Sequence, residues 1–106
     1  MATIEQFKEL EFKVARVVEA KKHPNADRLL VLTVEIGSEK KEIVSGIALH
    51  YQPEQLAGKL VVVVNNLEPA VIRGVASQGM VLAAQDGEVL TLVSPERPVA
   101  SGSTVK

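Results

Sequence analysis

Residues 65–80 bring several kinds of functional side chain together in one short stretch, whose glycines indicate a loop. Arg73, next to Gly74, supplies a guanidinium group that can bind a phosphate or a carbonyl oxygen. The stretch also offers two amides, a hydroxyl and a flexible thioether, on Asn66, Gln78, Ser77 and Met80. These groups suit an unstacked RNA nucleotide. The cation can bind its phosphate, the hydrogen-bonding groups can bind the edge of its base, and the adaptable apolar surface can pack on the face of the base.

The same side chains also have a purely structural explanation. Asparagines can complete the hydrogen bonding at a strand end, a serine and a glutamine can form a turn, and a methionine can fill a core. The residue types alone leave both interpretations open.

Basic residues gather in the first half of the chain. Positions 13–41 hold seven basic and four acidic residues, a local charge of +3, whereas the remainder holds five and nine, or -4, which gives -1 for the whole chain. A locally positive surface can bind phosphates on a weakly acidic protein, because exposed charges are screened beyond about 8–10 Å at physiological salt. The alternative is that these side chains only keep strand edges soluble. The candidate phosphate ligands in this region are Lys13, Arg16, Lys22 and Arg28.

The residues that most enzyme mechanisms need are missing. The chain has no cysteine and only two histidines, His23 and His50, which argues against disulfides, thiolate chemistry and a histidine or cysteine metal cluster. His23 precedes Pro24 among turn-forming residues, so we expect it to be a turn residue. No serine has a nucleophile-elbow spacing, and no phosphate-binding glycine loop ends in a lysine. We therefore expect no enzyme activity, no catalytic residue, no metal and no cofactor.

Size and composition fit one globular domain that covers residues 1–106. Hydrophobic residues make up 46% and charged residues 24% of the chain, which excludes disorder and a fibrous repeat. The longest apolar run, at residues 60–64, is far shorter than the ~20 residues that a membrane-spanning helix needs. Because no basic-then-apolar leader opens the sequence, we expect a cytoplasmic protein that does not contact a membrane.

The beginning of the chain predicts a short helix followed by a strand. Residues 4–10 carry apolar side chains at helical spacing behind Thr3, a suitable N-cap with Gln6 three positions on. An extended pattern follows, and one apolar face is expected to hold Phe12, Val14, Val18 and Ala20. We expect Phe7 and Phe12 to be buried in the core.

Further strands and a helical plug complete the predicted fold. After turn formers at 23–27, alternating apolar residues at 30–36 and the segment 42–46 predict a hairpin. Pro53 begins a short helix that Gly58 ends. The remaining strands are expected at residues 59–66, 79–84 and 89–93.

This order predicts an all-β barrel. It fits a five-stranded OB fold with a short helix between strands three and four, an N-terminal helix and a C-terminal strand extension. OB folds bind oligonucleotides or oligosaccharides on their open face. An SH3-like barrel is the alternative, although it does not need the helix at 53–57.

Several short motifs, in order along the chain, carry a resemblance to a known family. They are Phe12-Lys13-Val14-Ala15-Arg16-Val17, His23-Pro24-Asn25-Ala26-Asp27-Arg28-Leu29, Val44-Ser45-Gly46-Ile47, Asn66-Leu67 with Pro69, Ser77-Gln78-Gly79-Met80, and the closing residues 102–106. Together they make nearly the whole chain resemble the tRNA-binding domain family, found at the C-terminus of methionyl-tRNA synthetases and as small stand-alone proteins. The resemblance implies an OB fold that binds tRNA by its shape, near the corner, without reading the anticodon.

The leading hypothesis, which joins the residue chemistry to the resemblance, gives each candidate residue a role. We expect phosphate contacts from Lys13, Arg16, Lys22, Arg28 and Arg73, and contacts to sugars or exposed bases from Asn66, Ser77, Gln78 and Met80. The resemblance also implies a homodimer, formed through the N-terminal helix and the C-terminal extension, and a methionyl-tRNA synthetase catalytic subunit as a further partner. The chain departs from the family pattern at Glu68, Ala70 and Val71, where basic residues are common.

Two other functions are compatible with the same fold. One is a peptide-binding export chaperone of the CsaA type, which the sequence matches less closely because it retains the motif at residues 23–27. The other is a dimerisation appendix with no role in RNA binding. The sequence does not decide whether the chain acts alone or as part of a synthetase, and it does not identify a preferred tRNA.

Overall fold

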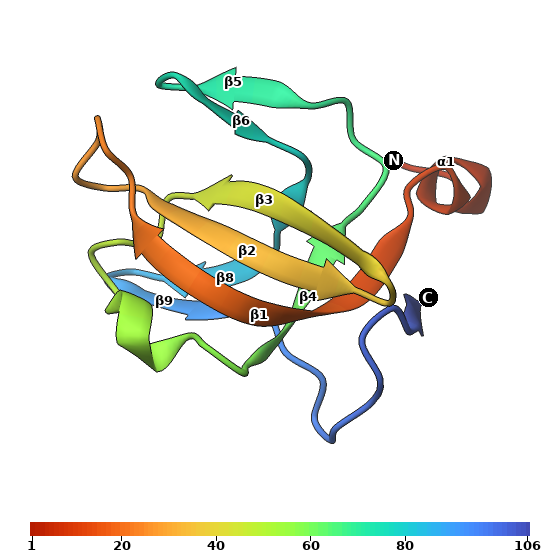
Figure 1. The fold of residues 1–106 in the computed structure, drawn as a ribbon. Helices are drawn as coiled ribbons and strands as arrows, with labels where there is room; N and C mark the ends of the chain where they lie inside the picture. The colour runs from red at the N-terminus through yellow and green to blue at the C-terminus, as the bar shows by residue number, and fades with distance from the viewer.

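One strongly curled antiparallel sheet forms the body of the protein in a computed structural model that describes residues 1–106 (Figure 1). Its strands lie in the order β3-β2-β1-β4-β7, with β10 paired to the start of β1. The bounds of these strands are β1 (Phe12–Lys22), β2 (Leu30–Ile36), β3 (Glu39–Ser45), β4 (Leu60–Val64), β7 (Met80–Val81) and β10 (Thr104–Val105). The predicted all-β, OB-like barrel with a C-terminal strand extension is confirmed.

Alternating side chains of β2 and β4 build the core. Leu30, Leu32 and Val34 share one face of β2 and are at most 1% exposed. In β4, alternate valines, Val61 and Val63, point into the barrel, while the two valines on the opposite face are also buried. The run of four valines is therefore explained by a strand that is covered on both sides.

The predicted helical plug is present as a 3₁₀ helix, η1 (Pro53–Gln55). Pro53 occupies its first turn, where a missing N–H costs nothing. Leu56 follows it and is fully buried in the barrel core. Gly58 ends the segment with φ 88°, and its N–H donates to the Val17 carbonyl over 2.7 Å.

The barrel closes where residues 77 and 78, at the end of β6 (Val75–Ser77), meet the edge of β3. The Val44 N–H donates to the Ser77 hydroxyl over 2.9 Å. The Gln78 N–H donates to the Glu42 carbonyl over 2.8 Å, and the Gln78 side-chain oxygen accepts from the Glu42 N–H over 3.0 Å. The Ser77 and Gln78 side chains thus take part in the hydrogen bonding along the edge of β3, which would otherwise lack partners there.

A short hairpin stands above the barrel beside the turn that follows β1 (Figure 1). It consists of β5 (Ala70–Ile72) and β6 (Val75–Ser77). The prediction of a loop in this region is therefore wrong. The two strands are too short for the period-two pattern to stand out, and only the turn at Arg73 and Gly74 separates them.

A second hairpin, β8 (Ala83–Asp86) with β9 (Val89–Leu92), joins the edge of β4 through the residues at its base. The Val62 N–H donates to the Val93 carbonyl, and the Leu82 N–H donates to the Val62 carbonyl. The single strand predicted at 79–84 is therefore two strands with different partners, since Met80 and Val81 pair with β4 and Ala83 begins β8.

A bulge in β1 changes which residues face the core. The pairing of β1 with β2 slips between Val17 and Glu19, and Val18 lies at the slip, 41% exposed. Because a bulge inserts one extra residue, the inward side chains are Ala15 and Val17 before it and Ala20 after it. The prediction of one apolar face with Phe12, Val14, Val18 and Ala20 is therefore wrong.

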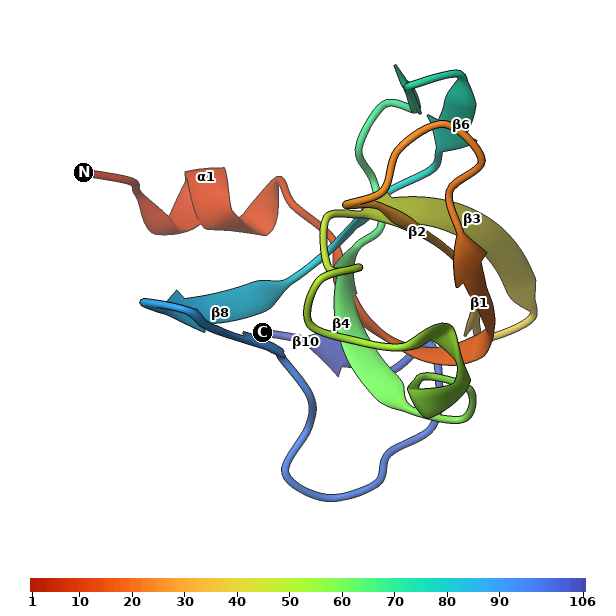
Figure 2. The ribbon, with the colours of Figure 1, turned by 90° about the vertical axis from the view of Figure 1, so that its left-hand side faces the viewer.

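The helix α1 (Ile4–Lys8) forms with the predicted cap, because the Thr3 hydroxyl accepts from the Gln6 N–H and the Gln6 side chain accepts from the Thr3 N–H. It has no buried residue. Phe7 is 42% exposed and Phe12 is half-buried, with their rings stacked at 5.3 Å between centroids. The prediction of two core phenylalanines is therefore wrong, because the helix stands beside the barrel and not against its core (Figure 2).

We expect Ser77→Ala to lower the free energy of unfolding by about 1–3 kcal/mol, because it leaves the buried Val44 N–H without an acceptor. Chemical denaturation is the measurement. Ser38→Ala, in an exposed turn, is the control and is expected to stay within about 0.5 kcal/mol of the native protein. Equal effects of the two substitutions would contradict the closing role of Ser77.

Candidate nucleic-acid interface

Two loops meet at one end of the barrel, and His23 joins them. The His23 Nδ1 atom accepts from the Asn25 N–H over 2.9 Å, so its Nε2 atom carries the proton and donates to the Ile72 carbonyl over 2.9 Å. The side chain is buried, at 6% exposure. As expected, His23 is a turn residue, and it ties the turn after β1 to the β5–β6 hairpin.

Asn25 and Arg73 add a reciprocal pair of hydrogen bonds between the same loops. The Asn25 side-chain amide donates to the Arg73 carbonyl, and the Arg73 guanidinium donates to the Asn25 carbonyl, each over 3.2 Å. Arg73 and Gly74 have φ angles of 52° and 91°, the left-handed backbone that a two-residue hairpin turn requires. The turn therefore fixes Arg73 at the tip of the hairpin, facing the other loop.

A groove lies between these loops. It has a volume of about 430 Å³ and is lined by residues 25–29 and Arg73. Arg28 and Arg73 are both exposed and bring two guanidinium groups to it, and Asp27 brings one carboxylate. Guanidinium groups bind phosphate oxygens in a bidentate manner, so this arginine groove suits a phosphodiester backbone.

The structure divides the predicted phosphate ligands into two groups. Lys22 ends β1 and lines a neighbouring hollow that shares Ala26 and Asp27 with the arginine groove. Lys13 lies nine positions earlier on the same strand, at most about 30 Å along it at 3.3 Å per residue. Its ammonium donates to the Thr104 hydroxyl. Arg16 lies in the middle of β1, with its Cα opposite Glu35, so neither it nor Lys13 joins the arginine groove.

The polar side chains predicted to touch bases are engaged within the protein. Ser77 is 3% exposed and closes the barrel together with the Gln78 amide oxygen. Asn66 accepts from the Glu11 N–H over 2.7 Å and donates to the Glu9 carbonyl over 2.8 Å. These bonds favour the structural interpretation of the three residues. They tie the barrel to its own edge and to the segment after α1.

Met80 is 48% exposed and does not fill the core. Its Cα lies opposite Val64, whose other partner is Phe12, so Met80 belongs to the end of the barrel near α1.

Asn25 shapes the arginine groove, although the sequence analysis does not include it among the site residues. An asparagine in a turn motif indicates hydrogen bonding to nearby backbone. The partner of the Asn25 side chain, however, is the Arg73 carbonyl, 48 positions away, which the sequence does not indicate.

We expect His23→Ala to lower the free energy of unfolding by about 1–3 kcal/mol, because it removes both hydrogen bonds of the buried ring. Amide exchange at residues 70–77 should become faster as the hairpin loses its tie to the turn. His50→Ala is the control, since that histidine is exposed. Unchanged exchange in the hairpin would show that His23 does not hold the two loops together.

Comparison with protein families gives one match over most of the chain. The profile of the family described as "Putative tRNA binding domain" matches residues 12–104. Among curated proteins, the methionine–tRNA ligase of Thermotoga maritima is 48% identical over 103 residues, which is 97% of this chain but only 16% of that ligase. The chain therefore spans a small part of the length of such relatives.

Two solved structures are similar over the full chain. The MetRS related protein from Pyrococcus horikoshii is 34% identical with a TM-score of 0.93, covering 100% of this chain and 98% of the other. The chaperone CsaA from Bacillus anthracis is 26% identical with a TM-score of 0.90, covering 100% and 99%. The structure contains no helix of the length and hydrophobicity that a membrane crossing requires.

Proposed function

The chain belongs to the tRNA-binding domain family, and from this premise we propose that it is a non-catalytic module that binds folded tRNA by its shape. The arginine groove is the observation that carries this proposal. Two exposed guanidinium groups from separate loops, Arg28 and Arg73, face it, and Lys22 lies beside it. Phosphate contacts of this kind fix the position of a nucleic acid without reading its sequence.

The composition supports backbone binding in preference to base stacking. Aromatic residues make up only 3% of the chain, and the two phenylalanines stack on each other. Binding by successive stacked bases needs a row of exposed aromatic rings. A folded tRNA, by contrast, presents a continuous phosphate surface that a few fixed cations can recognise.

The relatives suggest where such a module works. A methionine–tRNA ligase contains a segment 48% identical to this chain, and a MetRS related protein of nearly the same length has the same fold. In our proposal the module acts in the cytoplasm, within or beside a methionyl-tRNA synthetase, and raises the local concentration of tRNA at the catalytic subunit.

We expect Arg73→Ala to weaken tRNA binding and to reduce the slope of log affinity against log salt concentration by about 0.7–0.9 for each phosphate that the side chain neutralises. Fluorescence titration with folded tRNA at several salt concentrations measures both quantities. Arg97→Ala, on the exposed C-terminal segment, is the matched control and should change neither.

The same titration includes an unfolded polypeptide as ligand. Unchanged tRNA affinity and slope in Arg73→Ala would remove the arginine groove from the site. Polypeptide binding in the absence of any tRNA binding would favour the function of the CsaA neighbour instead.

A homodimer through the side that carries α1 is the second part of the proposal. The helix α1, the β8–β9 hairpin and the C-terminus lie on the same side of the barrel (Figure 2). Apolar side chains are exposed there, with Ile4 at 60%, Phe7 at 42% and Val89 at 66%. A two-fold contact on this side would cover them and leave the arginine groove of each protomer free.

We expect Phe7→Asp to make the protein monomeric at micromolar concentration, because it places a charge in the proposed contact. Sedimentation velocity measures the change, and tRNA affinity should fall because a monomer carries only one groove. Val71→Asp, at a site 75% exposed on the β5–β6 hairpin, should leave the dimer intact. A dimer that survives Phe7→Asp would place the contact elsewhere.

A further inference from the structure

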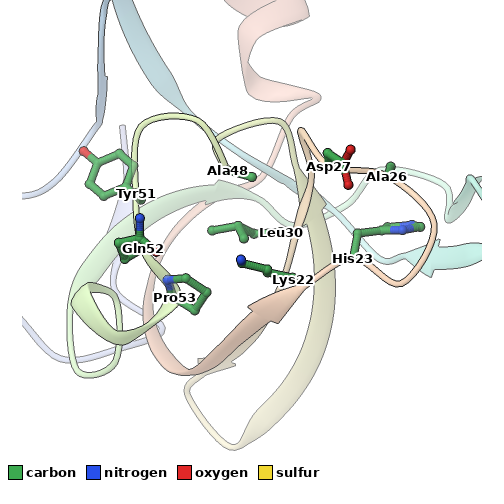
Figure 3. A pocket seen from close by; sticks show the side chains of 9 residues that line it. All are labelled: Lys22, His23, Ala26, Asp27, Leu30, Ala48, Tyr51, Gln52 and Pro53. Carbon is green, nitrogen blue, oxygen red and sulfur yellow. The ribbon is translucent and has the colours of Figure 1, made fainter.

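A second hollow adjoins the arginine groove and shares a wall with it. Ala26 and Asp27 line both spaces. The second hollow has a volume of about 270 Å³ and lies at the end of the barrel between the turn after β1 and the segment before η1. Figure 3 shows Gln52 and Pro53 on one side of it and Asp27 on the other, with Leu30 and Lys22 between them.

The hollow is apolar at its base and polar around its rim. Leu30, which is 1% exposed, and the half-buried Ala48 form the base, and the half-buried Pro53 ring forms a wall. The rim carries three exposed polar side chains, from Lys22, Asp27 and Gln52. The hollow therefore offers a ligand an apolar base and hydrogen-bonding groups at its rim.

The size of the hollow limits its ligand. Drug-sized ligands occupy pockets of roughly 300–1,000 Å³, so a hollow of about 270 Å³ suits one planar ring system. Bases splayed out of a folded RNA are ring systems of this kind, with an apolar face and a hydrogen-bonding edge.

Asp27 identifies which base fits. A carboxylate beside two arginines repels phosphate, but its two oxygens accept hydrogen bonds from neighbouring N–H groups. Guanine presents adjacent N1–H and N2–H donors on its Watson–Crick edge, which both carboxylate oxygens can accept, whereas adenine and cytosine each present one amino group beside an acceptor and uracil presents one N–H between two carbonyls. The Lys22 ammonium and the Gln52 amide can donate to the guanine O6 and N7 acceptors.

We propose that this hollow receives one unstacked guanine of the bound tRNA, while Arg28 and Arg73 hold the adjoining phosphates. The inference rests on the proposed tRNA binding and adds to it a base-specific contact. In this proposal the exposed Asp27 carboxylate binds the base, although its charge is unfavourable for the phosphates beside it.

Asp27→Asn separates this proposal from a purely electrostatic site, because the two predict opposite changes in tRNA affinity. Removing a negative charge beside a phosphate groove strengthens tRNA binding, whereas removing a bidentate partner of guanine weakens it. We expect about a tenfold loss of tRNA affinity, within the range of one bidentate base contact. Asp86→Asn, on the exposed β8–β9 hairpin, is the matched control and should have no effect.

A second variant tests the hollow itself. Ala48→Leu fills its base, so it should weaken tRNA binding by a similar factor without changing the salt slope, and its melting temperature checks that it folds. GMP and UMP serve as free-nucleotide probes in NMR titrations. GMP is expected to shift the Gln52 side-chain amide more than UMP does.

The outcomes are distinct. Unchanged or tighter tRNA binding by Asp27→Asn, with weaker binding by Arg73→Ala, overturns the guanine hollow and leaves the proposed function in place. A native protein that binds no tRNA overturns both, unless GMP still shifts Gln52, which would support the hollow as a site for free guanine nucleotides. Equal shifts from GMP and UMP overturn the base preference.

Discussion

The structure depends on how the chain closes one edge of β3, the edge that does not pair with β2. Its backbone groups need partners, and the chain meets this need with the Ser77 hydroxyl and with the backbone and side chain of Gln78. These contacts fix the end of β6, which carries the β5–β6 hairpin and places Arg73 opposite the turn after β1. The closure of the barrel and the shape of the arginine groove are thus parts of one hydrogen-bonding arrangement.

Sequence patterns predicted the fold where local chemistry decides it. The alternation at 30–36, the cap at Thr3 and the proline at the start of η1 all act within a few residues of one another. The pattern could not show the bulge at Val18 or the exposure of Phe7, because these depend on register and on how α1 is placed. The partners of a strand or a helix are set by tertiary packing, which a single sequence does not contain.

The candidate site was predictable in its cations but not in its geometry. Arg28 and Arg73 were identified as phosphate ligands from their residue type, and the structure brings them to one groove. Lys13 was given the same role, but the length of β1 places it at the other end of the barrel. Asn66 and Ser77 were suited to RNA by chemistry alone, yet their hydrogen bonds connect segments 55 and 33 positions apart. Only the folded chain shows that these groups are already engaged.

The reciprocal bonds between Asn25 and Arg73 have a consequence for the thermodynamics of association. A free arginine side chain loses rotational freedom when it grips a ligand, and each such loss reduces affinity. Here part of that freedom is already lost when the chain folds, because the Arg73 guanidinium donates to the Asn25 carbonyl. In the proposed function, less ordering of the Arg73 side chain is therefore needed when tRNA binds.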